Sequence, residues 1–250
     1  FMQQYYQHTM GLHERCMRFV ERCRAVPFWQ RLSRFLPAPR VDEYFVVRGS
    51  LVSVAEEYRN KVLDSPALLL RLFDLARARN LTIVPPLIED IHRHVDQMPA
   101  ETYRTPEVSN GFLRILAGPG TTATLEAMHR AHLLEKLVPA MGTVRGLMQF
   151  NQYHKYTVDE HSLLAVGRAE ALSQDTGVLG EVYRGIKRKD ILHLAVLMHD
   201  LGKGREEDHS DVGKRLSEEV ALRLGFDEQE TRTLSFLVHK HLLMAHTAFR

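Results

Sequence analysis

The chain has 250 residues, of which 44% are hydrophobic, which suffices for one large domain or two modest ones with a proper core. Its formal charge of +2 arises from interspersed basic and acidic residues, which argues against a nucleic-acid or membrane partner. With only two cysteines (Cys16 and Cys23) and no apolar stretch near the roughly 20 residues of a membrane span, we expect a reduced, cytoplasmic setting.

The first half of the chain is expected to be helical with one β-hairpin. Apolar residues at helical spacing predict helices over 3–35 and near 66–80, 85–97, 107–117 and 122–137. The β-rich residues 44–54, on both sides of Gly49-Ser50, predict a short hairpin. Ser65-Pro66 and Thr122 are suited to begin the helices that follow them.

A domain boundary is expected near Pro139 and Gly142, where the helical pattern is interrupted again. We therefore divide the chain into a helical region with a short hairpin, 1–142, and an entirely helical module, 143–250. The glycine-bearing segment 117–123 lacks the spacing of a phosphate-binding loop and is expected to be a connector.

Fourteen histidines are many for a chain of this length. Six of them lie on amphipathic helices without a carboxylate or cysteine pattern beside them, and we expect these to be ordinary surface residues: His8, His13, His92, His94, His129 and His132. The histidines of the second half lie beside carboxylates and helix ends. There, each can be either a metal ligand or an ordinary surface or core histidine.

One of these is His161. Thr157 and Glu160 have the form of a capping box, which places His161 in the first turn of a helix. A histidine at a helix start can simply face solvent, so this position alone does not decide between exposure and metal binding.

The second candidate position is the end of an apolar helix, 190–201, for which Asp190 is the expected N-cap. Its last residues include His199 and Asp200, about 100° apart on the helix, so both can lean toward one side. A divalent cation would remove the cost of burying an unpaired carboxylate there, and a buried His-Asp or Asp-Lys pair is the alternative. Lys203, in a Gly-Lys-Gly turn, is expected to be mobile, partly exposed and able to meet a phosphate oxygen.

Two further segments add histidines. A helix is expected to begin at His209 or Ser210, with Gly213 allowing a close approach to another helix. On a helix, His239 and His241 would point about 200° apart, so they are not expected to share an ion, and their spacing does not choose between them. A mixed His/Asp set suits Mn²⁺, Fe²⁺, Co²⁺, Ni²⁺ or Zn²⁺, and Mg²⁺ less well, and such ions promote phosphoester hydrolysis.

His161, His199-Asp200 and Gly202-Lys203 together resemble the HD superfamily of metal-dependent phosphohydrolases. Within this superfamily, the sequences of residues 153–161, 198–205, 208–210 and 241–244 are similar to the HD domain of bifunctional PII uridylyltransferase/uridylyl-removing enzymes. Residues 1–6 and 113–148 resemble the helical region that precedes that domain. The resemblance implies a mainly α fold: a helical N-terminal region with a short β-hairpin, followed by an all-helical HD domain. It also implies hydrolysis of a uridylyl group from a tyrosine of a PII signal protein.

By this resemblance the metal ligands are His161, His199, Asp200, His209 and His241, and the catalytic residues are Asp200 and Lys203, the latter as a phosphate contact. The ion would be Mn, Mg, Fe, Co, Ni or Zn. Lys240 stands where some relatives have a second adjacent histidine, which bears on whether one ion binds or two.

The family's nucleotidyltransferase pattern and regulatory domains are not found in the sequence, and its last HD aspartate is expected beyond Arg250. We therefore expect an internal piece of a longer parent chain, with an HD domain truncated at its C-terminus and weak in hydrolysis. The alternatives are an HD hydrolase of nucleotides or cyclic nucleotides, and a non-catalytic regulatory HD module.

Overall fold

The structure is a computed structural model that describes Thr9, Leu12, Cys16 and residues 39–148 and 156–248. These residues are mainly helical with one small sheet, which confirms the predicted fold class. Most of the helix predicted over 3–35, including Cys23, lies outside the described residues. Among the helices that are described, none has both the length and the apolar character needed to cross a bilayer.

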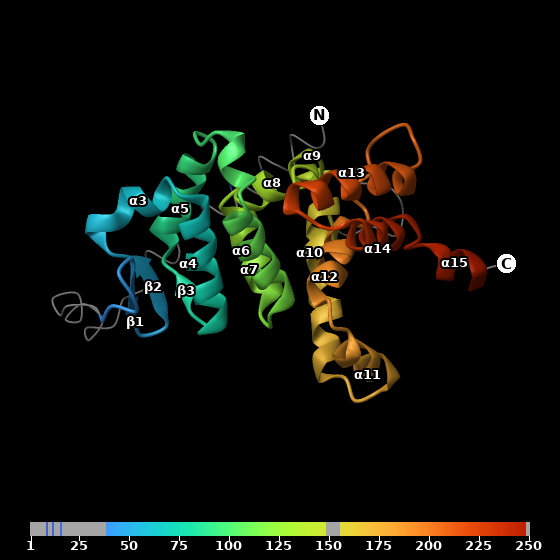
Figure 1. Cartoon of the computed structure of the whole chain (residues 1–250), viewed down its shortest axis with the longest axis horizontal. Helices are drawn as coiled ribbons and strands as arrows, with labels where there is room; N and C mark the ends of the chain where they lie inside the picture. Colours follow the sequence, from blue (N-terminus) through green and yellow to red (C-terminus); the bar gives the residue numbers. More distant parts are fainter. Residues whose placement is uncertain (1–8, 10–11, 13–15, 17–38, 149–155, 249–250) are drawn as a thin grey trace.

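The predicted hairpin is present at one end of the molecule (Figure 1). Strands β1 (Phe45–Arg48) and β2 (Leu51–Val54) pair antiparallel around Gly49, whose φ of 60° suits the tight turn. A third strand, β3 (Thr82–Ile83), pairs in parallel with β2 and was not predicted. Two residues are too few to produce an alternating pattern in the sequence.

The helices of the first region enclose a large apolar core. They are η2 (Glu56–Tyr58), α3 (Arg59–Leu63), α4 (Pro66–Ala78), α5 (Pro85–Val95), η3 (Ala100–Tyr103), α6 (Pro106–Ala117), α7 (Thr121–Arg130), α8 (Leu134–Leu137) and α9 (Ala140–Val144). As predicted, Ser65 caps α4, accepting a hydrogen bond from the amide of Leu68 at 3.4 Å.

Two predictions about this region were wrong. The helix expected over 122–137 is broken between α7 and α8, where His132 takes a left-handed φ of 58°. Thr122 does not cap α7; the cap is Gly120, and the first amides of the helix donate to the carboxylate of Glu170, far along the chain. A partner so distant in sequence replaces the local cap that the pattern suggested.

The second region contains α10 (Val158–Ala171), η4 (Leu172–Gln174), α11 (Val178–Gly185), α12 (Lys189–Met198), α13 (His209–Leu224), α14 (Glu228–His239) and α15 (Leu243–Ala248). The predicted N-cap of α12, Asp190, was wrong, because Arg188 takes that position. Asp190 instead lies in the first turn, where a carboxylate favours the helix dipole, and it pairs with Arg188 at 2.7 Å.

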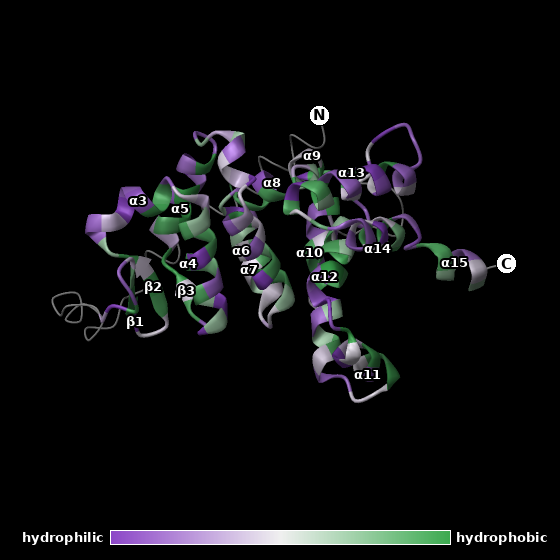
Figure 2. Ribbon diagram, in the orientation of Figure 1, coloured by the Kyte–Doolittle hydropathy of each residue, from purple (hydrophilic) through white to green (hydrophobic). Residues whose placement is uncertain are grey.

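Helix α12 lies at the centre of this region and contacts α6, α10 and α14. Figure 2 shows the hydrophobic part of α12, and Leu194, Leu197 and Met198 are fully buried. One continuous core joins residues on both sides of the predicted boundary, which falls within α9. The rigid surroundings of α12 therefore fix the position of the residues that follow it, beginning with His199.

Candidate metal centre

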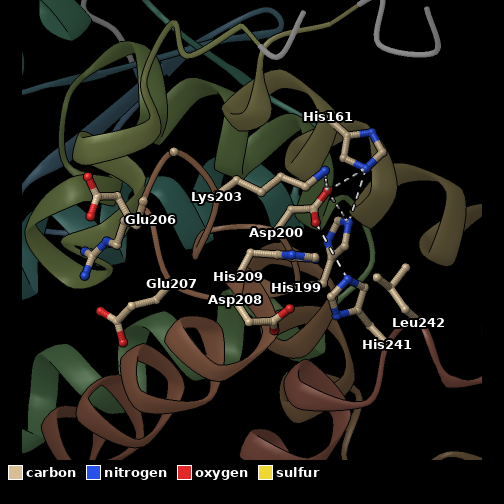
Figure 3. Close-up of a pocket in the computed structure, with 12 residues that line it drawn as sticks. His161, His199, Asp200, Lys203, Glu206, Glu207, Asp208, His209, His241 and Leu242 are labelled. Carbon is tan, nitrogen blue, oxygen red and sulfur yellow. Dashed lines mark hydrogen bonds and ion pairs between the residues drawn. The ribbon is translucent and has the colours of Figure 1, made fainter. Parts of the chain in front are cut away.

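Four segments bring polar side chains together at the C-terminal end of α12 (Figure 3). The first turn of α10 supplies one histidine, the end of α12 supplies a histidine and an aspartate, and α13 and the turn after α14 supply one histidine each. These residues are His161, His199, Asp200, His209 and His241. All five side chains that the sequence suggested as ligands thus lie around one point.

His161 is placed by the start of α10. The predicted capping box is present, and the carboxylate of Glu160 accepts a hydrogen bond from the amide of Thr157 at 3.4 Å. The box fixes the first turn, and His161 extends from this turn toward the end of α12.

Asp200 lies at the centre of the cluster and is only 4% exposed. Its Oδ2 atom is 3.2 Å from Nε2 of His199 and 3.4 Å from Nε2 of His161. The two Nε2 atoms are themselves 3.2 Å apart. One carboxylate oxygen and two imidazole nitrogens therefore face the same small volume.

The structure distinguishes between His239 and His241. Helix α14 ends at His239, so His241 lies in the following turn and the helical angle between the two does not apply. Nε2 of His241 is 3.7 Å from Oδ1 of Asp200, and His241, His209 and Asp200 form a second group whose ligand atoms lie within 4.8 Å of one another. His239 instead pairs with Asp211 at 3.1 Å.

Hydrogen bonds to the backbone orient two of these imidazoles. Nδ1 of His199 lies 2.7 Å from the carbonyl of Val196, and Nδ1 of His241 lies 2.7 Å from that of Val238. A carbonyl only accepts, so each Nδ1 carries a proton, and Nε2 is the atom left to bind an ion when the ring is neutral. Nε2 of His241 is buried without a hydrogen-bond partner, which is costly unless a cation accepts its lone pair. The donor set therefore fits a divalent cation.

Lys203 is partly exposed, as predicted, and it is paired. Its side chain is 12% exposed, and its ammonium lies 2.8 Å from Oδ2 of Asp200. Burial would raise the pKa of Asp200, but His199 and Lys203 outweigh it and hold that pKa well below its usual range. Asp200 is thus an ionised carboxylate that already attracts one cationic group.

Two glycines allow the site-forming segments to pack this closely. A Cβ on Gly202 would lie 2.1 Å from the carbonyl oxygen of His209, so the turn after α12 passes directly under the start of α13. A Cβ on Gly213 would lie 3.1 Å from Cγ1 of Val238, which confirms the predicted close approach of α13 to α14. These contacts bring His209 to the cluster and explain why the lysine turn is held in place.

The cluster forms the floor of a pocket of about 720 Å³. Its wall is the loop 204–208 together with Leu242, so charged side chains from one loop surround the opening. Ligand pockets commonly span about 300–1,000 Å³, so the space suits a nucleotide-sized group.

A second buried cluster was missed by the sequence analysis. His129, expected at the surface, is only 6% exposed and lies between Asp159 (Nε2 to Oδ2, 3.0 Å) and Glu135 (Nδ1 to Oε1, 2.8 Å). Arg145 also reaches Glu135, with Nε 3.0 Å from Oε1. Burial would lower the pKa of His129, but the two carboxylates outweigh it and raise that pKa. Nothing in the local spacing signals this, because Asp159 lies 30 positions away.

Comparison with known proteins places this geometry in a family. Residues 158–248 match the family model of the HD domain, a span that includes all five clustered residues. The chain carries an HD domain. HD domains depend on a metal ion, and the two His/Asp groups around Asp200 could bind one.

Most of the chain is also similar to proteins named bifunctional uridylyltransferase/uridylyl-removing enzyme. The relative from Azospirillum brasilense is 36% identical over 82% of this chain, that from Bradyrhizobium diazoefficiens 31% over 92%, and that from Erythrobacter litoralis 34% over 87%. The chain spans only 22–24% of the length of these relatives. The similarity extends well beyond the HD domain into the helical region before it.

Proposed function

We propose that this HD domain is a metal-dependent phosphodiester hydrolase that removes uridylyl groups from a tyrosine of a PII-type signal protein. The geometry around Asp200 is the observation that carries the proposal: one ionised carboxylate shared by two histidine groups, with an ammonium 2.8 Å away, at the floor of a pocket. The names of the relatives support the uridylyl-removing reaction.

The proposed ligands fall into two groups that share Asp200. One comprises His161 and His199, and the other His209 and His241. The ion bound by them would be Mn, Mg, Fe, Co, Ni or Zn; it supplies Lewis-acid polarisation of a phosphoryl oxygen and a more acidic water. The backbone hydrogen bonds of His199 and His241 hold their Nε2 lone pairs toward it.

Lys203 acts on the substrate in this proposal. Its ammonium already lies beside the carboxylate that would bind the ion, so a phosphoryl oxygen bound there would be within its reach. Hydrolysis breaks the bond between phosphorus and the tyrosine oxygen: the hydroxyl of water goes to phosphorus and its proton to the tyrosine oxygen. Asp200 and Lys203 neutralise and orient the charges at this centre.

We further propose that residues 143–250 are the catalytic module and residues 1–142 a supporting helical region, within a longer parent chain. The shared apolar core supports a fixed arrangement of the two parts rather than a flexible tether.

The test is release of UMP from uridylylated PII by the purified protein in Mn²⁺. Wild type should release UMP, Asp200→Asn should abolish release, and Lys203→Met should slow it without loss of bound metal. Asp211→Asn, an exposed carboxylate that pairs with His239, serves as the matched control and should behave as wild type.

The same preparation should be assayed with nucleotides and cyclic nucleotides. Faster turnover of those compounds than of uridylylated PII would contradict the proposed substrate and favour a nucleotide hydrolase. Complete absence of turnover by metal-loaded wild type, as opposed to the weak hydrolysis that the sequence predicts, would favour a regulatory HD module.

A further inference from the structure

Helices α7 and α10 are held together by polar contacts at both ends. The start of α10 meets the end of α7, and the end of α10 meets the start of α7, so the helices run antiparallel. Figure 1 shows the pair at the middle of the molecule. Only one of the two contacts lies near the candidate metal centre.

The near contact joins Asp159 to His129. Asp159 is fully buried, and besides the 3.0 Å contact to His129 its Oδ1 accepts a hydrogen bond from the amide of Gly146 at 3.1 Å. His129 is fixed in turn by Glu135, 2.8 Å from its other ring nitrogen. Both ring nitrogens of His129 face carboxylates, so the ring bridges α8 and α10.

The far contact joins Glu170 to the first turn of α7. Its carboxylate accepts hydrogen bonds from the amides of Thr121 and Thr122, both at 3.1 Å, and from the hydroxyl of Thr122 at 2.7 Å. This contact stabilises the same helix pair at the end away from the candidate metal centre. It therefore provides an internal control for any effect of the near contact.

His161 follows Asp159 by two positions, so the two side chains leave α10 about 200° apart. While Asp159 faces α7, His161 faces the opposite side, toward Asp200. A rotation of the first turn about its axis would move both side chains together. Because Asp159 is bound by two donors, that rotation is restricted, and so is the position of Nε2 of His161.

We propose that the His129–Asp159 pair is a positioning device for His161, which fixes the first turn of α10 so that the imidazole meets the ion bound at Asp200. The proposal rests on the proposed function in one respect, that His161 is a metal ligand. A binding site must hold its ligands within about 0.5 Å and 10–20° of the productive geometry, so a small rotation of this turn is sufficient to weaken it. His129 and Glu135 lie outside the segment 158–248 that matches the HD domain, so the helical region would contribute to the site without touching the ion.

The experiment is titration of the metal-free protein with Co²⁺, followed by calorimetry and by the visible spectrum of the bound ion. Four proteins are compared: wild type, Asp159→Asn, Glu170→Gln and His161→Ala. Asp159→Asn should weaken Co²⁺ binding about tenfold, as loss of a supporting residue typically does, and should shift the Co²⁺ spectrum. Glu170→Gln should leave both affinity and spectrum as in wild type, even where it lowers the melting temperature.

The outcomes separate the two proposals. If His161→Ala binds Co²⁺ as wild type does, His161 is not a ligand and the proposed metal site is wrong. If His161→Ala weakens binding but Asp159→Asn and Glu170→Gln give the same affinity, the site stands and the positioning role is wrong. If circular dichroism shows that Asp159→Asn does not fold, His129→Gln tests the same pair from α7. It should also weaken Co²⁺ binding, and an affinity equal to that of Glu170→Gln would contradict the positioning role.

Discussion

Two buried histidine clusters lie on opposite sides of the first turn of α10, and they use imidazole in opposite ways. In the network of His129, Glu135, Arg145 and Asp159, both ring nitrogens of the histidine face carboxylates. In the cluster around Asp200, His199 and His241 donate hydrogen bonds from Nδ1 to backbone carbonyls, which leaves Nε2 to bind an ion. His129 is thus held between carboxylates, whereas His199 and His241 each keep one ring nitrogen for a cation.

This difference separates a structural cluster from the proposed metal centre. The first cluster contains two basic side chains and two carboxylates that contact one another. The second contains several imidazole nitrogens around one carboxylate and opens to a pocket. Burial, a shifted pKa and a buried atom without a hydrogen-bond partner (Oε2 of Glu135, Nε2 of His241) occur in both, so none of these three properties identifies a metal centre.

The largest expected effect is that of Asp200→Asn on metal binding. Both histidine groups share this carboxylate, so its neutralisation should reduce divalent-metal affinity by orders of magnitude and remove hydrolysis. Elemental analysis after dialysis measures the bound metal. Asp211→Asn should retain wild-type metal content; equal metal in both variants would contradict the assigned centre.

Arg145→Met, in contrast to Asp200→Asn, should have its large effect on the stability of the fold. It leaves Glu135 buried without its guanidinium, which should lower the free energy of unfolding by about 3 kcal/mol. Urea unfolding measures this. Arg215→Met removes an exposed pair with Glu207 and should change stability by less than about 1 kcal/mol. Similar losses in the two variants would show that the buried network is no more important than a surface pair.

Lys203→Met should show that a bound metal ion can replace the lysine ammonium as the partner of Asp200. In metal-free protein the variant should be about 2 kcal/mol less stable, because Asp200 loses its ammonium partner. Saturating Mn²⁺ should abolish the difference, since the ion then neutralises the carboxylate. Lys214→Met, at an exposed pair with Glu218, is the control. A difference that persists in Mn²⁺ would mean that the ammonium and the ion do not compensate the same charge.

The smallest expected effect is on the pH dependence of stability. The pKa of His129 is raised in the folded protein, so its stabilising contribution is complete below about pH 6.5 and is lost as pH rises through the folded pKa. Glu135, whose pKa is lowered to about 2, stays ionised throughout. The stability difference between wild type and His129→Gln, from urea unfolding at pH 5.5 to 9, should therefore shrink as pH rises.

His132 supplies a control of opposite sign. Burial and the nearby Arg145 lower the pKa of His132 to about 4, so its contribution is present above about pH 6.5 and is lost as pH falls. His132→Asn, which tolerates the left-handed φ, should therefore show a difference that grows as pH rises. Parallel pH profiles for the two variants would contradict the assigned protonation states.

Local signals in the sequence predicted much of the fold. The hairpin around Gly49, the Ser65 cap of α4, the Thr157 capping box and the start of α13 depend on residues within one turn, and all four were predicted. The cap of α7 could not be predicted, because its amides are satisfied by Glu170 rather than by a neighbour. Likewise, His129 resembles a surface residue until Asp159 is brought against it by the packing of α10 on α7.

The candidate site shows the same limit. Adjacent polar side chains at the end of an apolar helix identified His199 and Asp200, and the HD resemblance added the remaining histidines. The choice between His239 and His241 depended on where α14 ends, and the packing of the turn after α12 depended on Gly202 lying against the backbone of His209. Both are packing effects that no spacing rule contains.

The most direct test of the central claim is the position of a bound ion. Crystals of the protein grown with Mn²⁺ should give an anomalous peak near the manganese absorption edge. The peak should lie within bonding distance, about 2 Å as for zinc with such ligands, of a carboxylate oxygen of Asp200 and of ring nitrogens of His161 and His199 or of His209 and His241. A peak in both groups would show a two-ion centre that shares Asp200. Crystals that bind Mn²⁺ elsewhere, with no peak at Asp200, would contradict the account.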